Sequence, residues 1–455
     1  MSGNDLPRHR AKLRAVPDSH PPSKSLPALS RAQVIWRWRI LVSSYLAYGG
    51  YYLTRKTFTI CKTSIAHDLH WELGDTAHIW TAYLVAYMVG MFINSFVGRR
   101  WGPRLLLLSG LGLSLVCNVL FGFANSFPTF LVFMFFNGLV QASGWPGSVG
   151  AVAHWLRPAE RGTIMGFWST SYLLGNMLVK SLGGFLLGSY GWRWSFWGCT
   201  VLSFLVWWVV FFWQRNRPED VGLAPIIDET ASRIQTVHAP QTDRVTLRQY
   251  ARLAGNPVIL AMGASYFCIK FLRYALDSWL PSFLNIEGLD VASASYYSQV
   301  FDFAGLGGVL LAGWALDHWF KNNWAALCAC MALGVIAGYA AVINAGSRPA
   351  AVAICFGLVG FMLYGPDTLL CGAASVQVAG EKNGVAVAGL VNGLGSVGAI
   401  IQEQVIGWFV RGHVEEGMRN TNRLALSVSI LMAVLLAGIA WHLHRSQGTR
   451  ETRAP

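Results

Sequence analysis

The stretch Tyr48-Gly-Gly-Tyr-Tyr-Leu-Thr-Arg-Lys56 places an arginine, Arg55, inside a run that otherwise has the composition of a membrane-spanning helix. A cation at that depth costs from roughly 3 to above 10 kcal/mol, so by default it marks a functional site. Tyr48, Tyr52 and Arg55 are spaced i, i+4 and i+7 and share one helix face. Two phenols and a guanidinium on one stripe could hold a phosphate or a carboxylate. The alternative is that Arg55 lies near a helix end and snorkels to the headgroups.

The composition is that of a polytopic membrane protein. Of the 455 residues, 54% are hydrophobic and 13% are charged, whereas soluble domains carry about 25% charged residues. The net charge of +13 comes from basic residues that cluster between apolar runs. That is the pattern of cytoplasmic loops and argues against nucleic-acid binding. The eight cysteines lack metal-ligand spacing and fall mostly in apolar runs, so we expect no metal and no cofactor.

Twelve segments are candidates to cross a bilayer, which takes about 20 apolar residues. Their approximate bounds are 36–60, 77–97, 104–123, 127–153, 162–187, 193–213, 257–284, 293–316, 324–344, 349–376, 384–410 and 422–443. We therefore predict an all-α membrane protein with twelve transmembrane helices in two halves. The predicted regions are an N-terminal tail over 1–35, a six-helix half over 36–213, a central loop over 214–256, a second six-helix half over 257–443 and a C-terminal tail over 444–455.

Lysine and arginine predict the orientation, because they concentrate in cytoplasmic loops. They are frequent in both tails, in the central loop and in the loops after the second and fourth segments, and sparse in most loops on the other side. Both termini are therefore expected in the cytoplasm, and the expected location is the plasma (inner) membrane. The first 30 residues are polar and lack the apolar core of a cleaved signal peptide.

An internal repeat connects the two halves. The stretch that begins at Ser95, after the second segment, has the pattern of the stretch that begins at Gly313, after the eighth, and the offset is 313 − 95 = 218 residues. Arg55 plus 218 falls on Arg273, inside the seventh segment. Each half thus places one arginine at a matching point of its first helix. Parallel halves that meet at a central site are the architecture of one large transporter class, so the repeat favours the functional interpretation of Arg55.

Two arginines from opposite halves predict a phosphate site. A guanidinium matches phosphate oxygens bidentately, and a phosphate monoester carries about −1.5 to −2 charge near pH 7. Two cations would neutralise one such ligand, whereas a carboxylate needs only one. An empty site with two poorly compensated cations should resist closing, so the same electrostatics predict exchange rather than uniport.

Further charges lie within the predicted helices. Tyr266, Lys270, Arg273 and Asp277 share one face of the seventh helix. Lys270 and Asp277 either line the site or pair with each other or with an arginine. The remaining intramembrane charges either pair, line the cavity, snorkel or relay protons, as in a proton symporter; they are Lys180, Asp302, Asp367 and Glu403.

Five stretches carry a family resemblance across most of the chain: Tyr51-Tyr-Leu-Thr-Arg-Lys-Thr-Phe58, Asn137-Gly-Leu-Val-Gln-Ala-Ser-Gly-Trp-Pro146, Glu160-Arg-Gly162, Phe271-Leu-Arg-Tyr-Ala-Leu-Asp-Ser-Trp-Leu-Pro281 and Tyr364-Gly-Pro366. The chain resembles the major facilitator superfamily, and more narrowly its organophosphate:phosphate antiporter family. The resemblance implies Arg55 and Arg273 as the phosphate-binding pair, with Tyr48, Tyr52 and Tyr364 around them.

The chain departs from the family pattern at three positions. Tyr172 stands where bacterial members often have a histidine in the fifth helix, and Met91 where many have a lysine in the second. Arg99 replaces the acidic residue of the first loop motif. The first two departures alter the pocket and leave the phosphate ester open, and the third alters a gating contact.

The leading hypothesis is an exchanger of an organic phosphate, such as a sugar phosphate or glycerol phosphate, for inorganic phosphate by alternating access. We expect a monomer that needs only the lipid bilayer and its two ligands. The predicted substrate-binding residues are Arg55, Arg273, Tyr48, Tyr52, Lys270, Tyr172, Tyr364 and Trp145. Those predicted for gating or charge pairing are Lys56, Asp277, Arg99 and Asp317.

Two alternatives remain open at this point. One is a transporter-like receptor that binds a sugar phosphate and regulates a membrane sensor kinase. The other is a proton-coupled carrier of organic anions that uses Glu403 or Asp302. An enzyme is not indicated, because the sequence has no recognisable nucleophile–base pair or metal cluster.

Overall fold

The computed structural model describes residues 29–157, 160, 164–165, 167–168, 170–226, 252–321, 323–345 and 348–451. Within its helices, the side chains at 92, 95–100, 153, 373, 376, 380–386 and 446–451 lie outside the description. Residues 1–28 of the predicted N-terminal tail (1–35) and residues 227–251 of the predicted central loop (214–256) lie outside the described residues.

The first half contains α1 (Arg31–Asp68), α2 (Asp75–Phe121), α3 (Phe127–Gln141), α4 (Gly144–Ala153), α6 (Ser171–Leu178), a π-helical turn η1 (Val179–Gly183), α7 (Gly184–Tyr190) and α8 (Trp192–Trp213). A short 3₁₀ turn, η2 (Pro218–Val221), follows. The second half contains α11 (Pro257–Ile286), α12 (Val291–Tyr297), α13 (Gln299–His318), α14 (Trp324–Asn344), α15 (Pro349–Leu369), a π-helical turn η3 (Leu370–Ala374), α16 (Ser375–Phe409) and α17 (Val414–Glu451).

The described helices combine into twelve passes, which confirms the predicted all-α membrane fold. The long helix α2 makes two of them, because Gly102 has a φ of 76° and Pro103 follows it. A left-handed backbone at glycine and the missing N–H of proline break a helix at such a point. Conversely, some passes consist of more than one helical element. They are α3 with α4, α6 with η1 and α7, α12 with α13, and α15 with η3. Eight of the described passes are long and apolar enough to cross a membrane.

Helix α1 extends farther than the sequence predicts. It ends at Asp68 rather than near residue 60, so Arg55 lies 68 − 55 = 13 residues before its end. At 1.5 Å per residue that is about 20 Å of helix. Arg55 is only 8% exposed. The position and burial argue against the interpretation of Arg55 as a snorkelling residue.

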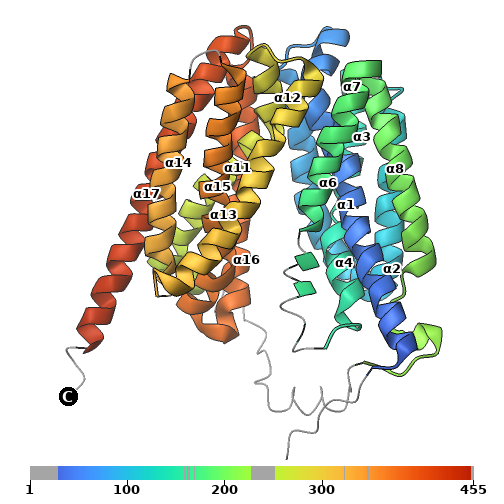
Figure 1. Ribbon diagram of the computed structural model, residues 1–455, viewed down its shortest axis with the longest axis horizontal. Coiled ribbons are helices and arrows are strands. Elements are labelled where there is room, and N and C mark those ends of the chain that lie inside the picture. Colours follow the sequence, from blue (N-terminus) through green and yellow to red (C-terminus); the bar gives the residue numbers. More distant parts are fainter. Residues whose placement is uncertain are drawn as a thin grey trace, which may run out of the picture.

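The two halves stand side by side and approach each other at one end (Figure 1). At that end a Cβ on Gly184 of α7 would lie 2.8 Å from Ser295 of α12, and one on Gly407 of α16 would lie 2.4 Å from Ala77 of α2. We call this the closed end; it carries the connections at 69–74, 287–290 and 410–413. Toward the end that holds the C-terminus, the ribbons of the two halves diverge (Figure 1).

Apolar packing explains why each half is a unit. The buried members of one cluster all lie in the second half, and those of another all lie in the first half. A smaller cluster joins the halves at the closed end; its buried members are Ala77, Ala275, Trp279, Phe283, Ile406, Val410 and Met418. The fold therefore places the facing surfaces of α1, α6, α11, α13 and α16 where a site between the halves can form.

Candidate functional site

Arg55 points into a polar and aromatic environment, and no carboxylate of a described residue forms an ion pair with it. Its Nε donates to Oε1 of Gln141 over 3.1 Å. Its guanidinium carbon lies 4.8 Å from the ring centres of Tyr52 and Tyr87 and 5.8 Å from that of Tyr83. Its Nη2 is buried and has no hydrogen-bond partner. An uncompensated guanidinium with a free donor is the feature expected of an anion ligand site.

Gln141, which was not among the residues predicted for the site, holds Arg55 in place. Its amide Nε2 donates to the carbonyl of Tyr51, to Thr54 Oγ1 and to Ser114 Oγ, at 3.1, 2.8 and 2.7 Å. These bonds turn its Oε1 toward Arg55. Gln141 lies in the quoted stretch Asn137–Pro146, and a glutamine in an otherwise apolar segment is the sequence signal that could have identified it. The structure shows that its side chain is fully buried.

Aromatic side chains predicted for the site do gather beside Arg55. The ring of Tyr48 lies 5.7 Å from that of Tyr52 and 5.6 Å from that of Trp145. A Cβ on Gly175 would lie 2.6 Å from Cβ of Tyr52, so only glycine allows α6 to approach α1 this closely. That close approach brings the Tyr172 ring within 6.1 Å of the Tyr52 ring.

Arg273 lies on the other side of Tyr172. Its guanidinium carbon is 5.9 Å from the Tyr172 ring centre and 4.5 Å from that of Tyr364. The Tyr52–Tyr172 pair thus has Arg55 at one end and Arg273 at the other. Unlike Arg55, however, Arg273 has a carboxylate partner, because its Nη1 lies 2.5 Å from Asp367 Oδ2.

Among the described residues, four ion pairs join the halves. One of them is partly exposed and lies at the closed end, between Arg411 and Asp75. In the other three, which lie in the interior, a lysine of the first half meets a carboxylate of the second. Lys56 pairs with Asp277. Lys62 lies 2.5 Å from Glu403, with both side chains fully buried. Lys180 lies 2.5 Å from Asp302. These pairs occupy the half of the interface nearer the closed end.

The ion pairs settle several alternatives that the sequence left open. Asp277 pairs with Lys56, and neither with Lys270 nor with an arginine. Lys180 is buried and does not snorkel. Lys62, which lies beyond the predicted first helix, was missed because that helix was predicted to end near residue 60.

Lys270 is 8% exposed and has neutral partners. Its Nζ donates to Asn392 Oδ1 over 2.7 Å and to Ser396 Oγ over 3.4 Å, both on α16. The ring centres of Tyr266 and Tyr274 lie 5.3 and 5.7 Å from Nζ. Among the described residues, no carboxylate forms an ion pair with it.

The remaining predicted gating residues lie away from this cluster. Asp317 is exposed at the end of α13 and forms no ion pair with a described residue. The side chain of Arg99 lies in the part of α2 that is not described. Met91, the position where relatives were expected to have lysine, is partly buried in α2.

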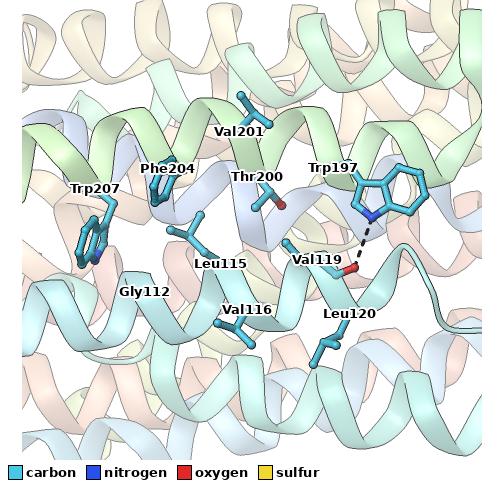
Figure 2. Close-up of a pocket in the computed structure, with 10 residues that line it drawn as sticks. All are labelled: Gly112, Leu115, Val116, Val119, Leu120, Trp197, Thr200, Val201, Phe204 and Trp207. Atoms are coloured by element: carbon cyan, nitrogen blue, oxygen red, sulfur yellow. Dashed lines mark hydrogen bonds between the residues drawn. The ribbon is translucent and has the colours of Figure 1, made fainter.

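A different kind of pocket lies between α2 and α8. This groove has a volume of about 550 Å³. Apolar side chains such as Leu115, Val116 and Phe204 line it (Figure 2), and the Trp197 indole donates to the carbonyl of Val119 over 3.3 Å. No charged side chain lines it. Such a groove suits hydrocarbon rather than a phosphate.

The comparisons with known proteins agree with the fold. A family model described as Major Facilitator Superfamily matches residues 22–402. A glycerol-3-phosphate transporter of Bacillus subtilis is 25% identical over 415 residues, which are 89% of this chain and 92% of the relative. A probable hexose phosphate transport protein of Chlamydia trachomatis is 27% identical, over 80% of this chain and 83% of the relative.

Two further matches bear on function and on fold. The membrane sensor protein UhpC of Salmonella typhimurium is 26% identical, over 82% of this chain and 84% of the relative. A solved structure of a bacterial homologue of the human lysosomal transporter Spinster superposes with a TM-score of 0.69 at 15% identity, covering 89% of this chain and 97% of that structure.

Proposed function

This chain belongs to the major facilitator superfamily, and we propose that it carries an organic phosphate across the membrane in exchange for inorganic phosphate. Membership makes it a multi-pass membrane transporter rather than an enzyme. Its relatives include proteins named for glycerol-phosphate and hexose-phosphate transport, which confirms the narrower resemblance stated from the sequence. The substrate and the exchange mode are the proposal.

The observation that carries the proposal is the state of Arg55. Its charge is buried, and within the described part of the chain no carboxylate forms an ion pair with it and Nη2 has no hydrogen-bond partner. A phosphate would supply both the negative charge and the acceptor. Arg273 then contributes further N–H donors from the other half, beyond the one that it gives to Asp367.

Asp367 supports an ester that carries hydroxyl groups. The residue is 8% exposed, and its Oδ1 is buried without a hydrogen-bond partner, while Oδ2 accepts from Arg273. An unfilled acceptor of this kind is costly unless a ligand donates to it. A sugar or glycerol hydroxyl can donate to this oxygen while its phosphate lies at Arg55, whereas inorganic phosphate has only the P–OH donors of the group that Arg55 binds.

The ion pair next to Arg55 links binding to opening of the closed end. Lys56 follows Arg55 in the chain and pairs with Asp277 across the two halves. A phosphate at Arg55 would compete with Asp277 for the Lys56 ammonium. That competition would weaken one connection between the halves, so that the loaded carrier opens more readily than the empty one. With both termini on the cytoplasmic side of the plasma membrane, this conformation is open toward the cytoplasm.

Counterflow in liposomes tests the proposal. Purified protein is reconstituted with phosphate inside, and labelled phosphate, glycerol 3-phosphate or hexose 6-phosphate is added outside. We expect uptake that requires internal phosphate and persists when a protonophore collapses the pH gradient. Equal uptake into liposomes without internal phosphate would contradict exchange. Loss of uptake with the protonophore would instead favour the proton-coupled alternative, in which Glu403 or Asp302 carries the proton.

A sugar-phosphate receptor is the second candidate, because the chain is also similar to a protein named as a membrane sensor. It predicts binding without flux. A thermal-shift screen with sugar phosphates, run beside the counterflow assay on the same preparation, separates the two. Stabilisation by a ligand that the protein does not exchange would support the receptor.

A further inference from the structure

The charges between the halves do not cancel. In the described interior of the bundle, six cations face four carboxylates; the cations are Arg55, Lys56, Lys62, Lys180, Lys270 and Arg273, and the carboxylates are Asp277, Asp302, Asp367 and Glu403. Each carboxylate forms an ion pair with one cation. Two positive charges are left without an anion, one on each half.

Those two charges belong to Arg55 and Lys270, and not to Arg55 and Arg273. Arg273 shares its charge with Asp367 at 2.5 Å. Asp367 can offset only one cation, and no other described carboxylate forms an ion pair with Lys270. The paired arginine therefore adds hydrogen bonds to the site but little net charge.

Lys270 has a donor to spare. An ammonium carries three N–H donors, and two of them reach Asn392 and Ser396. Both partners are neutral, as are the surrounding Tyr266, Tyr274 and the nearby thiol of Cys371. Burial of an ammonium with only neutral partners is unfavourable, and an anionic ligand removes that cost.

The position of Lys270 also suits a ligand. It precedes Asp277 by seven residues on the same face of α11, which is about 10 Å along the helix. Asp277 faces Lys56, the neighbour of Arg55. Lys270 thus lies on the side of Arg55 that is away from the closed end, where the halves diverge (Figure 1).

We propose that Lys270 is a specificity-determining residue and that, together with Arg55, it makes the site selective for divalent phosphate. Arg273 and Asp367 act as a neutral pair. The proposal rests on the phosphate exchange proposed above. It names the ionic form of the substrate that the protein takes and the residue that selects it.

Two small phosphate esters test charge selectivity directly. Methyl phosphate, a monoester, loses its second proton near pH 6, whereas dimethyl phosphate remains a monoanion. Both are measured as inhibitors of phosphate exchange in liposomes at pH 7 and pH 5. For the unmodified protein we expect methyl phosphate to inhibit about ten times better than dimethyl phosphate at pH 7, and the ratio to fall toward one at pH 5.

Three variants then assign the second charge. Lys270→Met should bring the pH 7 ratio close to one, and Lys270→Arg should keep it. The charge-balanced double variant Arg273→Gln/Asp367→Asn should also keep it, even if exchange becomes slower, because the net charge of the site is unchanged. If Lys270→Met does not transport, the same ratio is measured by ligand-induced thermal stabilisation; if it does not fold, Lys270→Gln takes its place.

The outcomes are distinct. A ratio that survives in Lys270→Met and disappears in the Arg273/Asp367 double variant would overturn the assignment and make Arg273 the second charge. Exchange by the unmodified protein with no preference between the two esters would also overturn it, while the proposed function stands. Absence of any phosphate exchange or binding would reject the proposed function itself.

Discussion

Replacing Glu403 by glutamine should shift the protein away from the conformation described above. The Lys62–Glu403 pair joins α1 to α16, and both side chains are fully buried. Lys62 also donates to Ser278 and lies 3.9 Å from the centre of the Trp279 ring, so few other groups could offset its charge. Leaving one member of a buried pair without its partner costs about 3–5 kcal/mol.

That cost applies only while Lys62 is buried. In a conformation whose closed end has opened, water can solvate the ammonium, so the cost becomes a difference between two conformations. At 1.36 kcal/mol per decade, 3–5 kcal/mol corresponds to a shift of about 100-fold or more in the equilibrium.

Spin-label distance measurements across the closed end can detect such a shift. Labels are placed at Tyr190 on α7 and Glu416 on α17, both exposed, in a background from which the eight native cysteines have been removed. Glu403→Gln should move the distance distribution toward longer separations. The double variant Lys62→Met/Glu403→Leu should restore shorter ones, because it leaves no bare charge.

A surface variant serves as the matched control. Arg193→Gln removes an ion pair with Asp68 that lies within the first half and is partly exposed. Exposed pairs contribute at most about 1 kcal/mol, so the distribution should stay unchanged. If Glu403→Gln has the same distance distribution as its parent, the Lys62–Glu403 pair does not hold the closed end, and the reasoning fails.

Three further predictions concern transport. Arg55→Lys should reduce phosphate exchange in liposomes by at least about 100-fold, because lysine keeps the charge but loses the planar fork; activity near that of an Arg193→Lys control would refute the role of Arg55. Neutralising Lys56 or Asp277 alone should slow exchange, and reversing both, Lys56→Asp with Asp277→Lys, should recover part of the rate; a double variant no better than the worse single one would contradict the pairing. Asp367→Asn should raise the KM for a hydroxylated ester by about tenfold, or about 1.4 kcal/mol, more than that for inorganic phosphate, and equal changes for both ligands would exclude a hydroxyl contact.

Much of the fold follows from the sequence because membrane crossing leaves a one-dimensional signal. Apolar runs of the required length predicted twelve helices, and loop charges and motifs indicated a transporter of the major facilitator type. The end of the first helix was misjudged, since polar residues such as Lys62 interrupt the apolar run. A helix that buries its charges against other helices does not need apolar composition throughout.

For the candidate site, the sequence predicted which residues to place in it, and the tertiary structure determined how their charges are compensated. An arginine in an apolar helix and a repeat offset are sequence properties, so Arg55 and Arg273 could be selected without coordinates. Ion pairing is a property of distance across the interface of the two halves. In the sequence Arg55 and Arg273 are equivalent, but in the fold Asp367 pairs with Arg273 and Asp277 pairs with Lys56. No carboxylate among the described residues forms an ion pair with Arg55 or Lys270. Ion pairs form between side chains that lie a few ångströms apart in space. Residue spacing along one helix therefore cannot show which carboxylate of another helix will lie that close.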